Sequence, residues 1–268
     1  MAYIMENDDE ITRLEIKTIA SVVESFARKA GLGPGMRVAD AGCGPGVTTS
    51  ALSAVVGEGG SALGFDISEK RIERARERYD GEGISFAVRD FLEPIEGLGS
   101  FDFVWIRFGL EYYKAECFDI VRNLSAILKE GGILCLVDLD HNCLSHYGMS
   151  PRLEGAFAGA MRQLEAKANF DPYAGRKLYS HLVRLGFEDV GVEAGAHHLI
   201  YGELREADEY NWSKKIEVLA RKLRIELPGY SGPQEFHEDF MSFFRDPGRF
   251  TYTPVIAAWG RKPREEKA

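Results

Sequence analysis

Residues 37–49, which read RVADAGCGPGVTT, decide the fold class of this 268-residue chain. A short apolar run ends at Asp40, and glycines then recur at Gly42, Gly44 and Gly46 before a helix-compatible stretch. A strand that turns at once into a helix needs residues that tolerate unusual backbone angles, and a ligand that approaches the backbone needs positions without side chains. Glycine meets both needs. The stretch therefore predicts a strand–loop–helix unit that binds a ligand, with an ordinary tight turn as the alternative.

A second apolar run, SALGFD, ends at Asp66, where an acidic side chain can accept hydrogen bonds from ribose hydroxyls. The spacing of the glycines separates two classes of nucleotide fold. A dinucleotide fingerprint G-x-G-x-x-G that starts at Gly42 needs glycine or alanine at Val47, and one that starts at Gly44 needs it at Thr49. Neither alignment therefore matches the dinucleotide fingerprint. A nicotinamide-dependent oxidoreductase is therefore the weaker alternative.

The acidic residue followed by G-x-G-x-G resembles the first motif of the class I S-adenosylmethionine-dependent methyltransferases. The resemblance covers nearly the whole chain and implies S-adenosylmethionine as cofactor and S-adenosylhomocysteine as product. It also implies that an acid and an apolar residue after the third strand bind adenine. After the fourth strand, Arg107 can bind the methionine carboxylate or an acidic substrate, because a guanidinium forms a two-pronged contact with a carboxylate. The residues that we expect at the cofactor are Asp40, Gly42, Cys43, Gly44, Gly46, Asp66, Ile67, Arg71, Asp90, Phe91 and Arg107.

The first half of the chain alternates apolar runs with amphipathic stretches, and glycines mark the junctions. Repeated strand–helix units of this kind predict a parallel sheet. The resemblance implies an α/β, Rossmann-like three-layer sandwich whose mostly parallel sheet has seven strands, an antiparallel last strand and a helical insertion. The predicted strands are 37–40, 62–66, 84–88, 101–106 and 133–137, and the predicted helices are 11–30, 47–56, 68–79 and 116–129.

The regular alternation ends after Asp138. Helical patterns then cover 151–168 and 174–185, strand patterns cover 187–193, extending toward Ile200, and 253–260, and a further helical pattern covers 203–225.

We expect residues 1–268 to form a single methyltransferase domain, in which residues 1–35 are an N-terminal helical cover. The segment 201–250 is longer than a hairpin connection and is rich in aromatic residues. It is therefore a candidate lid or substrate-binding element, and a surface hairpin or a dimer contact are the alternatives.

The composition limits the classes of partner. The formal net charge is −9, and no dense Lys/Arg cluster stands out, so a nucleic-acid partner is unlikely. The four cysteines lack a C-x-x-C spacing, which favours reduced thiols in a cytoplasmic protein and no metal site. The N-terminus does not read as a signal peptide, and the apolar runs are too short for a membrane span. A homodimer stays open.

Ligands of open α/β sheets bind at the carboxyl ends of the strands, which selects the residues just after the fourth and fifth strands. We expect His141 to be a general base, and Phe108, Tyr112, Tyr113 and His146 to line the substrate pocket. Adjacent residues of a strand point to opposite faces, so His197 and His198 are expected to diverge and to be poor joint metal ligands.

The chain lacks the N-P-P-Y or D-P-P-Y tetrapeptide of nucleic-acid amine methyltransferases at its fourth-strand exit, which reads IRFG, and it has no Pro-Cys pair. We therefore expect methyl transfer to a small-molecule acceptor. Because such motifs report cofactor binding and not transfer, a catalytically silent S-adenosylmethionine-binding sensor or structural protein is the main alternative.

Overall fold

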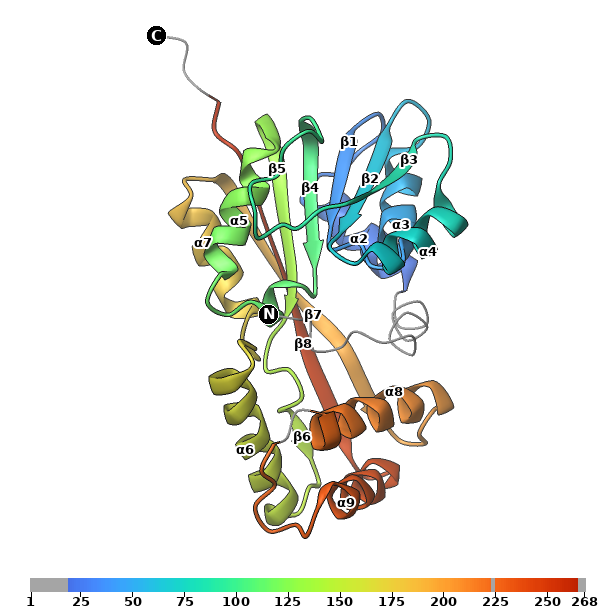
Figure 1. Cartoon of the computed structure of the whole chain (residues 1–268), viewed down its shortest axis with the longest axis vertical. Helices are drawn as coiled ribbons and strands as arrows, with labels where there is room; N and C mark the ends of the chain where they lie inside the picture. The colour runs from blue at the N-terminus through green and yellow to red at the C-terminus, as the bar shows by residue number, and fades with distance from the viewer. Residues whose placement is uncertain (1–18, 223–224, 265–268) are drawn as a thin grey trace.

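The computed structural model of the protein describes residues 19–222 and 225–264 and contains one mixed eight-stranded sheet (Figure 1). The strand order is β3-β2-β1-β4-β5-β8-β6, and β7 pairs with β8. The first five strands pair in parallel, whereas β8 is antiparallel to β5, β6 and β7. The strands are β1 (Arg37–Ala41), β2 (Ser61–Asp66), β3 (Ile84–Val88), β4 (Phe101–Arg107), β5 (Leu128–Leu139), β6 (His146–Tyr147), β7 (Glu188–Tyr201) and β8 (Phe250–Arg261).

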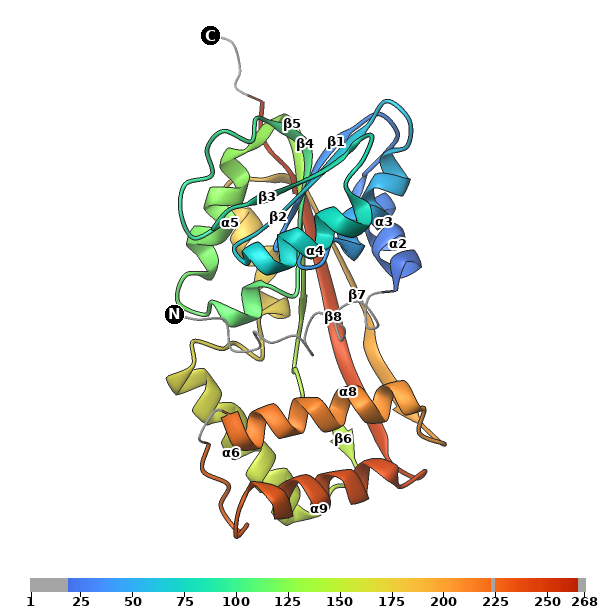
Figure 2. The same cartoon turned by 45° about the vertical axis from the view of Figure 1, so that its right-hand side comes forward.

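Helices cover both faces of this sheet, so its central strands are apolar on both sides and the expected three-layer sandwich is confirmed (Figures 1 and 2). Helices α2 and α3 pack on one face, and α5 and α7 pack on the other. The helices of this lobe are α2 (Ala20–Ala30), α3 (Val47–Val56), α4 (Glu69–Tyr79), α5 (Cys117–Ala126) and α7 (Leu178–Arg184), with 3-10 turns η1 (Leu110–Tyr112) and η2 (Gly175–Lys177).

A second lobe lies beyond the carboxyl ends of the parallel strands, where the long strands β7 and β8 run out of the sandwich (Figure 2). Its helices are α6 (Pro151–Lys167), α8 (Glu206–Glu217) and α9 (Pro233–Arg245), with a π-helical turn η3 (Val218–Lys222) after α8. They share a separate apolar core, and its large aromatic members include Phe157, Trp212, Phe236, Phe240 and Phe244. The predicted helical insertion therefore contributes to a lobe with a core of its own.

Several boundaries differ from the sequence-based expectation. Helix α5 ends at Ala126 rather than at residue 129, because Leu128 already pairs with Phe101 in the sheet. The predicted helix over 203–225 is shorter, since α8 ends at Glu217 and continues as the turn η3. The sheet has eight strands instead of seven because the two-residue β6 adds to β8, and neither β6 nor α9 was predicted.

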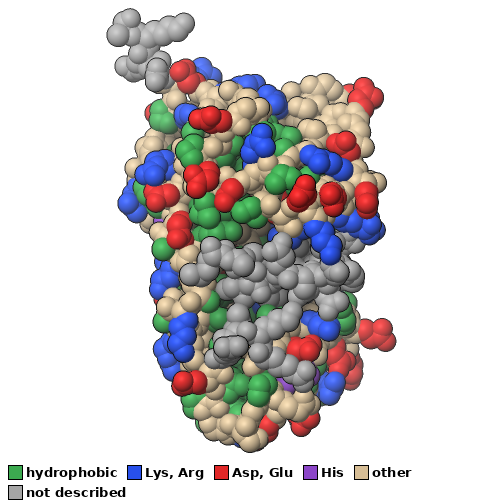
Figure 3. All heavy atoms as spheres, in the orientation of Figure 1, with side chains coloured by type: hydrophobic (Ala, Val, Ile, Leu, Met, Phe, Trp, Pro, Cys, Tyr) green, Lys and Arg blue, Asp and Glu red, His purple; other side chains and the backbone are tan. Residues whose placement is uncertain are grey.

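Helix α2 confirms the C-terminal part of the helix predicted over 11–30, whereas residues 11–18 lie outside the described residues. It packs Val23 and Ala27 against the sheet face that also receives α3. On the molecular face in Figure 3, acidic and basic side chains are interspersed. No helix within residues 19–222 and 225–264 combines the length and apolar character that a membrane crossing requires.

Candidate functional site

The glycine-rich loop joins β1 to α3 through three residues with left-handed backbone angles. Gly42, Gly44 and Gly46 have φ values of 69°, 55° and 89°. A side chain at Gly46 would also collide with its surroundings, because an added Cβ would lie 3.0 Å from Ala75 Cβ and from Phe86 Cζ. The sequence therefore requires glycine here for both conformation and packing, as the motif indicated.

Asp40 is buried at the end of β1 and accepts a hydrogen bond of 2.7 Å from the Thr49 hydroxyl on α3. This bond fixes the first turn of α3 to the strand. Burial raises the pKa of the Asp40 carboxyl to about 7, against the opposing effects of Thr49 and of the Arg107 charge. Burial likewise raises the pKa of the neighbouring Cys43 thiol far above its usual value, so this cysteine is an inert packing residue and not a nucleophile.

Asp66, at the end of β2, binds the loop that follows β1. Its carboxylate accepts hydrogen bonds from the Gly44 N–H at 3.0 Å and from the Ser68 N–H at 2.9 Å, and Arg71 lies 3.7 Å away. A carboxylate has about four lone-pair sites, so Asp66 can still accept from a ligand hydroxyl. Its neighbour Ile67 is half exposed on the same loop.

The end of β3 places an aromatic pair beside this loop. Phe91 is buried, and its ring edge would lie 3.4 Å from a Cβ added at Gly42. Tyr113 meets Phe91 edge-on, with 5.4 Å between ring centroids. The pKa of Tyr113 is raised by burial and then by the charges of Asp90 and Asp66. Tyr113, which we expect in the substrate pocket, therefore lies beside Phe91, which we expect at the adenine.

Arg107 ends β4 between two acidic strand ends. Burial lowers the pKa of its guanidinium to about 10, while the charges of Asp40 on β1 and Asp138 on β5 oppose that shift. Its Cζ atom lies 4.0 Å from the ring centroid of Phe108, which has a φ of 57°. A guanidinium held among strand ends can form a two-pronged bond to a carboxylate.

Sequence reasoning missed a buried polar chain that starts at Asp138. Asp138 accepts backbone hydrogen bonds from Leu139 at 2.8 Å and from Glu111 at 3.1 Å, which fixes the turn η1 to β5. The Glu111 carboxylate in turn accepts from the Asn142 amide at 2.6 Å, and the Asn142 oxygen accepts from the Lys215 ammonium at 3.1 Å. These hydrogen bonds thus join the sheet to α8 of the second lobe. Burial and the Glu111 charge raise the pKa of Asp138 well above its usual value.

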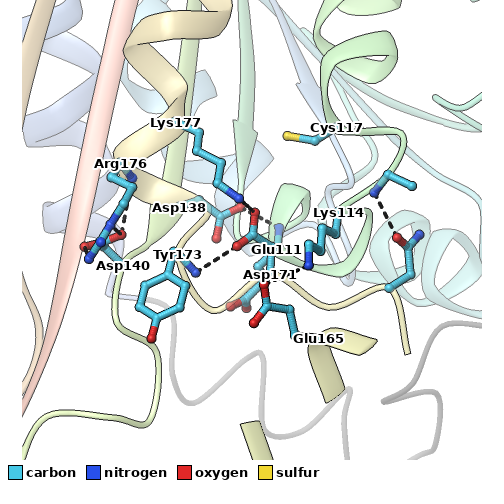
Figure 4. A network of polar contacts seen from close by, with 12 residues as sticks. Glu111, Lys114, Cys117, Asp138, Asp140, Glu165, Asp171, Tyr173, Arg176 and Lys177 are labelled. Carbon is cyan, nitrogen blue, oxygen red and sulfur yellow. Dashed lines mark hydrogen bonds and ion pairs between the residues drawn. The ribbon is translucent and has the colours of Figure 1, made fainter. Parts of the chain in front are cut away.

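Figure 4 shows Glu111, Asp138 and Asp171 close together, with Lys177 reaching Asp171 from η2. The Asp171 N–H donates to the Glu111 carbonyl at 2.7 Å. This acidic cluster is therefore held from several elements that are distant in the sequence. The rule that selects residues after the fourth and fifth strands includes Glu111 and Asp138 but not Asp171.

The histidine expected to be a general base and the histidine expected in the substrate pocket lie in different surroundings. His141 is half-buried in the turn after β5, where its Nδ1 lies 2.9 Å from the Ser145 hydroxyl. His146 lies in β6 within the second lobe, with its Nδ1 2.9 Å from the Thr251 hydroxyl and aromatic rings on several sides. Burial lowers the pKa of His146 to about 4, so its imidazole is neutral at pH 7.

Tyr112 packs on Phe170, with 5.7 Å between ring centroids, at the border of the second-lobe core. Its backbone belongs to η1, the turn that Asp138 fixes.

The expectation that His197 and His198 diverge is wrong. Their ring centroids are 4.2 Å apart. The pairing of β7 with β8 shifts register between Ala196 and His198, and a bulge of this kind places adjacent side chains on one side. Within the described residues, no group of three or more His, Cys, Asp or Glu side chains could hold a metal ion.

Comparison with known proteins agrees with this geometry. Residues 38–132 match the family model described as a methyltransferase domain. The chain is 36% identical over 113 residues to a demethylmenaquinone methyltransferase of Staphylococcus aureus, a match that covers 40% of this chain and 44% of that protein. It is 40% identical over 98 residues to a magnesium-protoporphyrin O-methyltransferase of Rhodobacter capsulatus, covering 35% and 41%. The chain thus spans less than half the length of these curated relatives.

Among solved structures, the phosphoethanolamine N-methyltransferase 2 of Haemonchus contortus in complex with S-adenosyl-L-methionine has a TM-score of 0.56 and 17% identity. The superposition covers 91% of this chain and 53% of that one, and at this identity it shows the fold alone. The matched segment holds the glycine loop, Asp66, the Phe91 site and Arg107. Residues 38–132 therefore match a methyltransferase domain, and the chain shares its overall fold with a solved methyltransferase.

Proposed function

We propose that the protein transfers a methyl group from S-adenosylmethionine to a small-molecule acceptor. The observation that carries this proposal is the loop from Gly42 to Gly46, whose left-handed glycines leave the backbone bare beside the buried carboxylate of Asp66. The hydrogen bond from the Gly44 N–H to Asp66 holds this loop against the end of β2. Such a cradle suits a nucleoside without phosphates.

The residues present fit this cofactor. Asp66 has acceptor capacity for ribose hydroxyls, Asp90 can accept from the adenine amino group, and Phe91 with Tyr113 offers ring contacts. Arg107 can bind the methionine carboxylate. Around these we place Asp40, Gly42, Cys43, Gly44, Gly46, Ile67 and Arg71 as the frame of the cofactor site.

The cofactor, when bound, supplies a methyl group already activated on a sulfonium. The protein then has to align the acceptor with the S–CH3 axis and exclude water. Phe108 and Tyr112 lie after β4 on the acceptor side, and His141 is the candidate base for an acceptor that must lose a proton. His146 is also assigned to the substrate pocket, in the part that belongs to the second lobe.

Further features of the proposal concern the whole chain. The curated relatives named above act, by their names, on demethylmenaquinone and magnesium-protoporphyrin, which supports a small-molecule acceptor here and not a nucleic acid. We infer a single methyltransferase domain that includes the second lobe, and residues 201–250 as the candidate lid. Four buried free cysteines support a cytoplasmic location. The protein can carry out the proposed methyl transfer as a homodimer.

Calorimetric titration with S-adenosylmethionine, S-adenosylhomocysteine, NAD and NADP tests the proposal. We expect micromolar binding of the first two and no heat with the nicotinamide cofactors. Heat with NAD or NADP alone would contradict it and would point to redox chemistry. A screen of acceptors with the loaded protein separates an enzyme from a silent binding protein, because only an enzyme forms S-adenosylhomocysteine in proportion to the acceptor.

A further inference from the structure

A continuous row of aromatic rings leads from the carboxyl end of β4 into the second lobe. Neighbouring ring centroids along it are 4.7 Å, 4.2 Å and 5.5 Å apart. The strand bulge in β7 creates the middle of the row, because it brings two adjacent imidazoles side by side. We call the following four residues the aromatic row: Phe108, His197, His198 and Trp212.

Each end of the aromatic row carries a cation. The Arg107 guanidinium lies over Phe108 at 4.0 Å, and the Lys215 ammonium lies over Trp212 at 5.1 Å. Arg107 has the carboxylates of Asp40 and Asp138 nearby, so its charge is balanced. Lys215 differs, because no carboxylate within the described part of the chain forms an ion pair with it, and its hydrogen-bond partner is the neutral amide of Asn142.

A half-buried ammonium without a counter-ion is unusual, because charges removed from water are normally paired. Lys215 is half-buried, and one of the three N–H donors of an ammonium bonds to Asn142 at 3.1 Å. Beside it, the indole N–H of Trp212 is buried without a hydrogen-bond partner among the described residues, and Trp212 itself is only 1% exposed. Two donors at the junction of the lobes therefore have unused capacity, and both suit an anionic oxygen.

We propose that the acceptor is a planar aromatic compound that carries an anionic group such as a carboxylate. Its ring lies along the half-buried part of the aromatic row, at Phe108, His197 and His198, and its anionic group binds the Lys215 ammonium of α8. This inference rests on the proposed methyl transfer and names the acceptor class of that same site. An amine acceptor would instead bring a second cation to Lys215, whose hydrogen-bond partner is a neutral amide, and like charges repel.

Binding of a defined probe tests this inference. Calorimetry of the S-adenosylhomocysteine-loaded protein with 3-hydroxy-2-naphthoate should show saturable binding. The same hydroxylated ring without the carboxylate, 2-naphthol, should bind about tenfold or more weakly, because it lacks the charged contact. The Lys215→Met variant should bind the two compounds about equally, whereas Lys215→Arg should keep the preference for the acid.

The adjacent Lys214 provides a matched control, since it lies on the same helix and pairs with Glu217 at 3.5 Å. Lys214→Met should leave both affinities unchanged. The inference is overturned if wild-type protein does not bind 3-hydroxy-2-naphthoate, if it binds 2-naphthol equally well, or if Lys215→Met keeps the preference. S-adenosylhomocysteine binding is recorded for each variant, so loss of the cofactor, which would sink the proposed function, is distinguished from loss of the acceptor alone.

Discussion

At the scale of single residues, the site depends on carboxylates whose surroundings give them different tasks. Asp40 accepts a hydrogen bond from Thr49 and so fixes the first turn of α3 to β1. Asp66 holds the loop through Gly44 and keeps acceptor capacity for a ligand. The hydrogen bonds of these two acids distinguish their tasks, whereas their order in the sequence does not.

Asp66→Asn is expected to weaken S-adenosylmethionine binding by roughly 1–3 kcal/mol, because an amide accepts fewer hydrogen bonds and carries no charge. Calorimetric titration measures the change. Asp80→Asn, at an exposed position after α4, is the control and should leave the affinity unchanged. Equal affinity of Asp66→Asn and wild type would remove Asp66 from the cofactor site.

Gly46→Ala is expected to lower the free energy of unfolding more than Gly59→Ala does. Both glycines have similar left-handed φ values, 89° and 83°, so the backbone strain, about 1–3 kcal/mol, is matched. An added Cβ at Gly59 meets nothing within 4 Å, whereas at Gly46 it lies 3.0 Å from Ala75, Phe86 and Tyr79. Urea denaturation of both variants gives the difference, and equal losses would show that strain alone fixes this position.

At the scale of elements, a hydrogen-bond network runs from Asp138 through Glu111 and Asn142. It joins β5, η1 and the turn after β5 to α8. Burial raises the pKa of Asp138, and the charge of the neighbouring Glu111 carboxylate raises it further. An acid whose pKa is raised on folding contributes stability below its unfolded pKa and loses it as the pH rises through the folded value.

Glu111→Gln should therefore reduce this loss, because it removes the charge that raises the pKa of Asp138 while keeping an oxygen to accept from Asn142. We expect the melting temperature of the variant, relative to wild type, to increase as the pH rises from about 5 to about 8. Thermal unfolding across that range measures it. Melting curves that stay parallel would mean that the two carboxyl groups do not interact.

At the scale of the whole molecule, the second lobe lies beyond the carboxyl ends of the parallel strands (Figure 2) and has an apolar core of its own. The second core encloses His146, whose pKa burial lowers to about 4. A base with a lowered folded pKa gives stability that is complete above its unfolded pKa, near 6.5, and is lost as the pH falls toward 4.

Acidification should thus destabilise the second lobe, by at most about 3 kcal/mol from His146 alone. We expect hydrogen exchange of α6, α8 and α9 to accelerate between about pH 6.5 and pH 4. His146→Gln should reduce the acceleration, while His237→Gln on α9 should behave like wild type. Identical exchange in wild type and His146→Gln would contradict the link.

The sequence by itself determined the sandwich lobe and its glycine-rich loop, because local rules act there. Three glycines in five residues, and acids at the ends of β1 and β2, follow from short-range backbone geometry that a linear pattern displays. Strand and helix alternation likewise fixed the parallel sheet, apart from boundaries such as that between Ala126 and Leu128, where pairing in the sheet overrode helix propensity.

Only the tertiary structure decided how the sandwich joins the second lobe. Glu111, Asn142 and Lys215 are far apart in the sequence and meet because β4, β5 and α8 converge. The bulge that aligns His197 with His198 depends on the register of β7 against β8, and no local pattern reveals it. The placement of His146 inside a second apolar core has the same cause, since burial is a property of the packed molecule and sets its pKa.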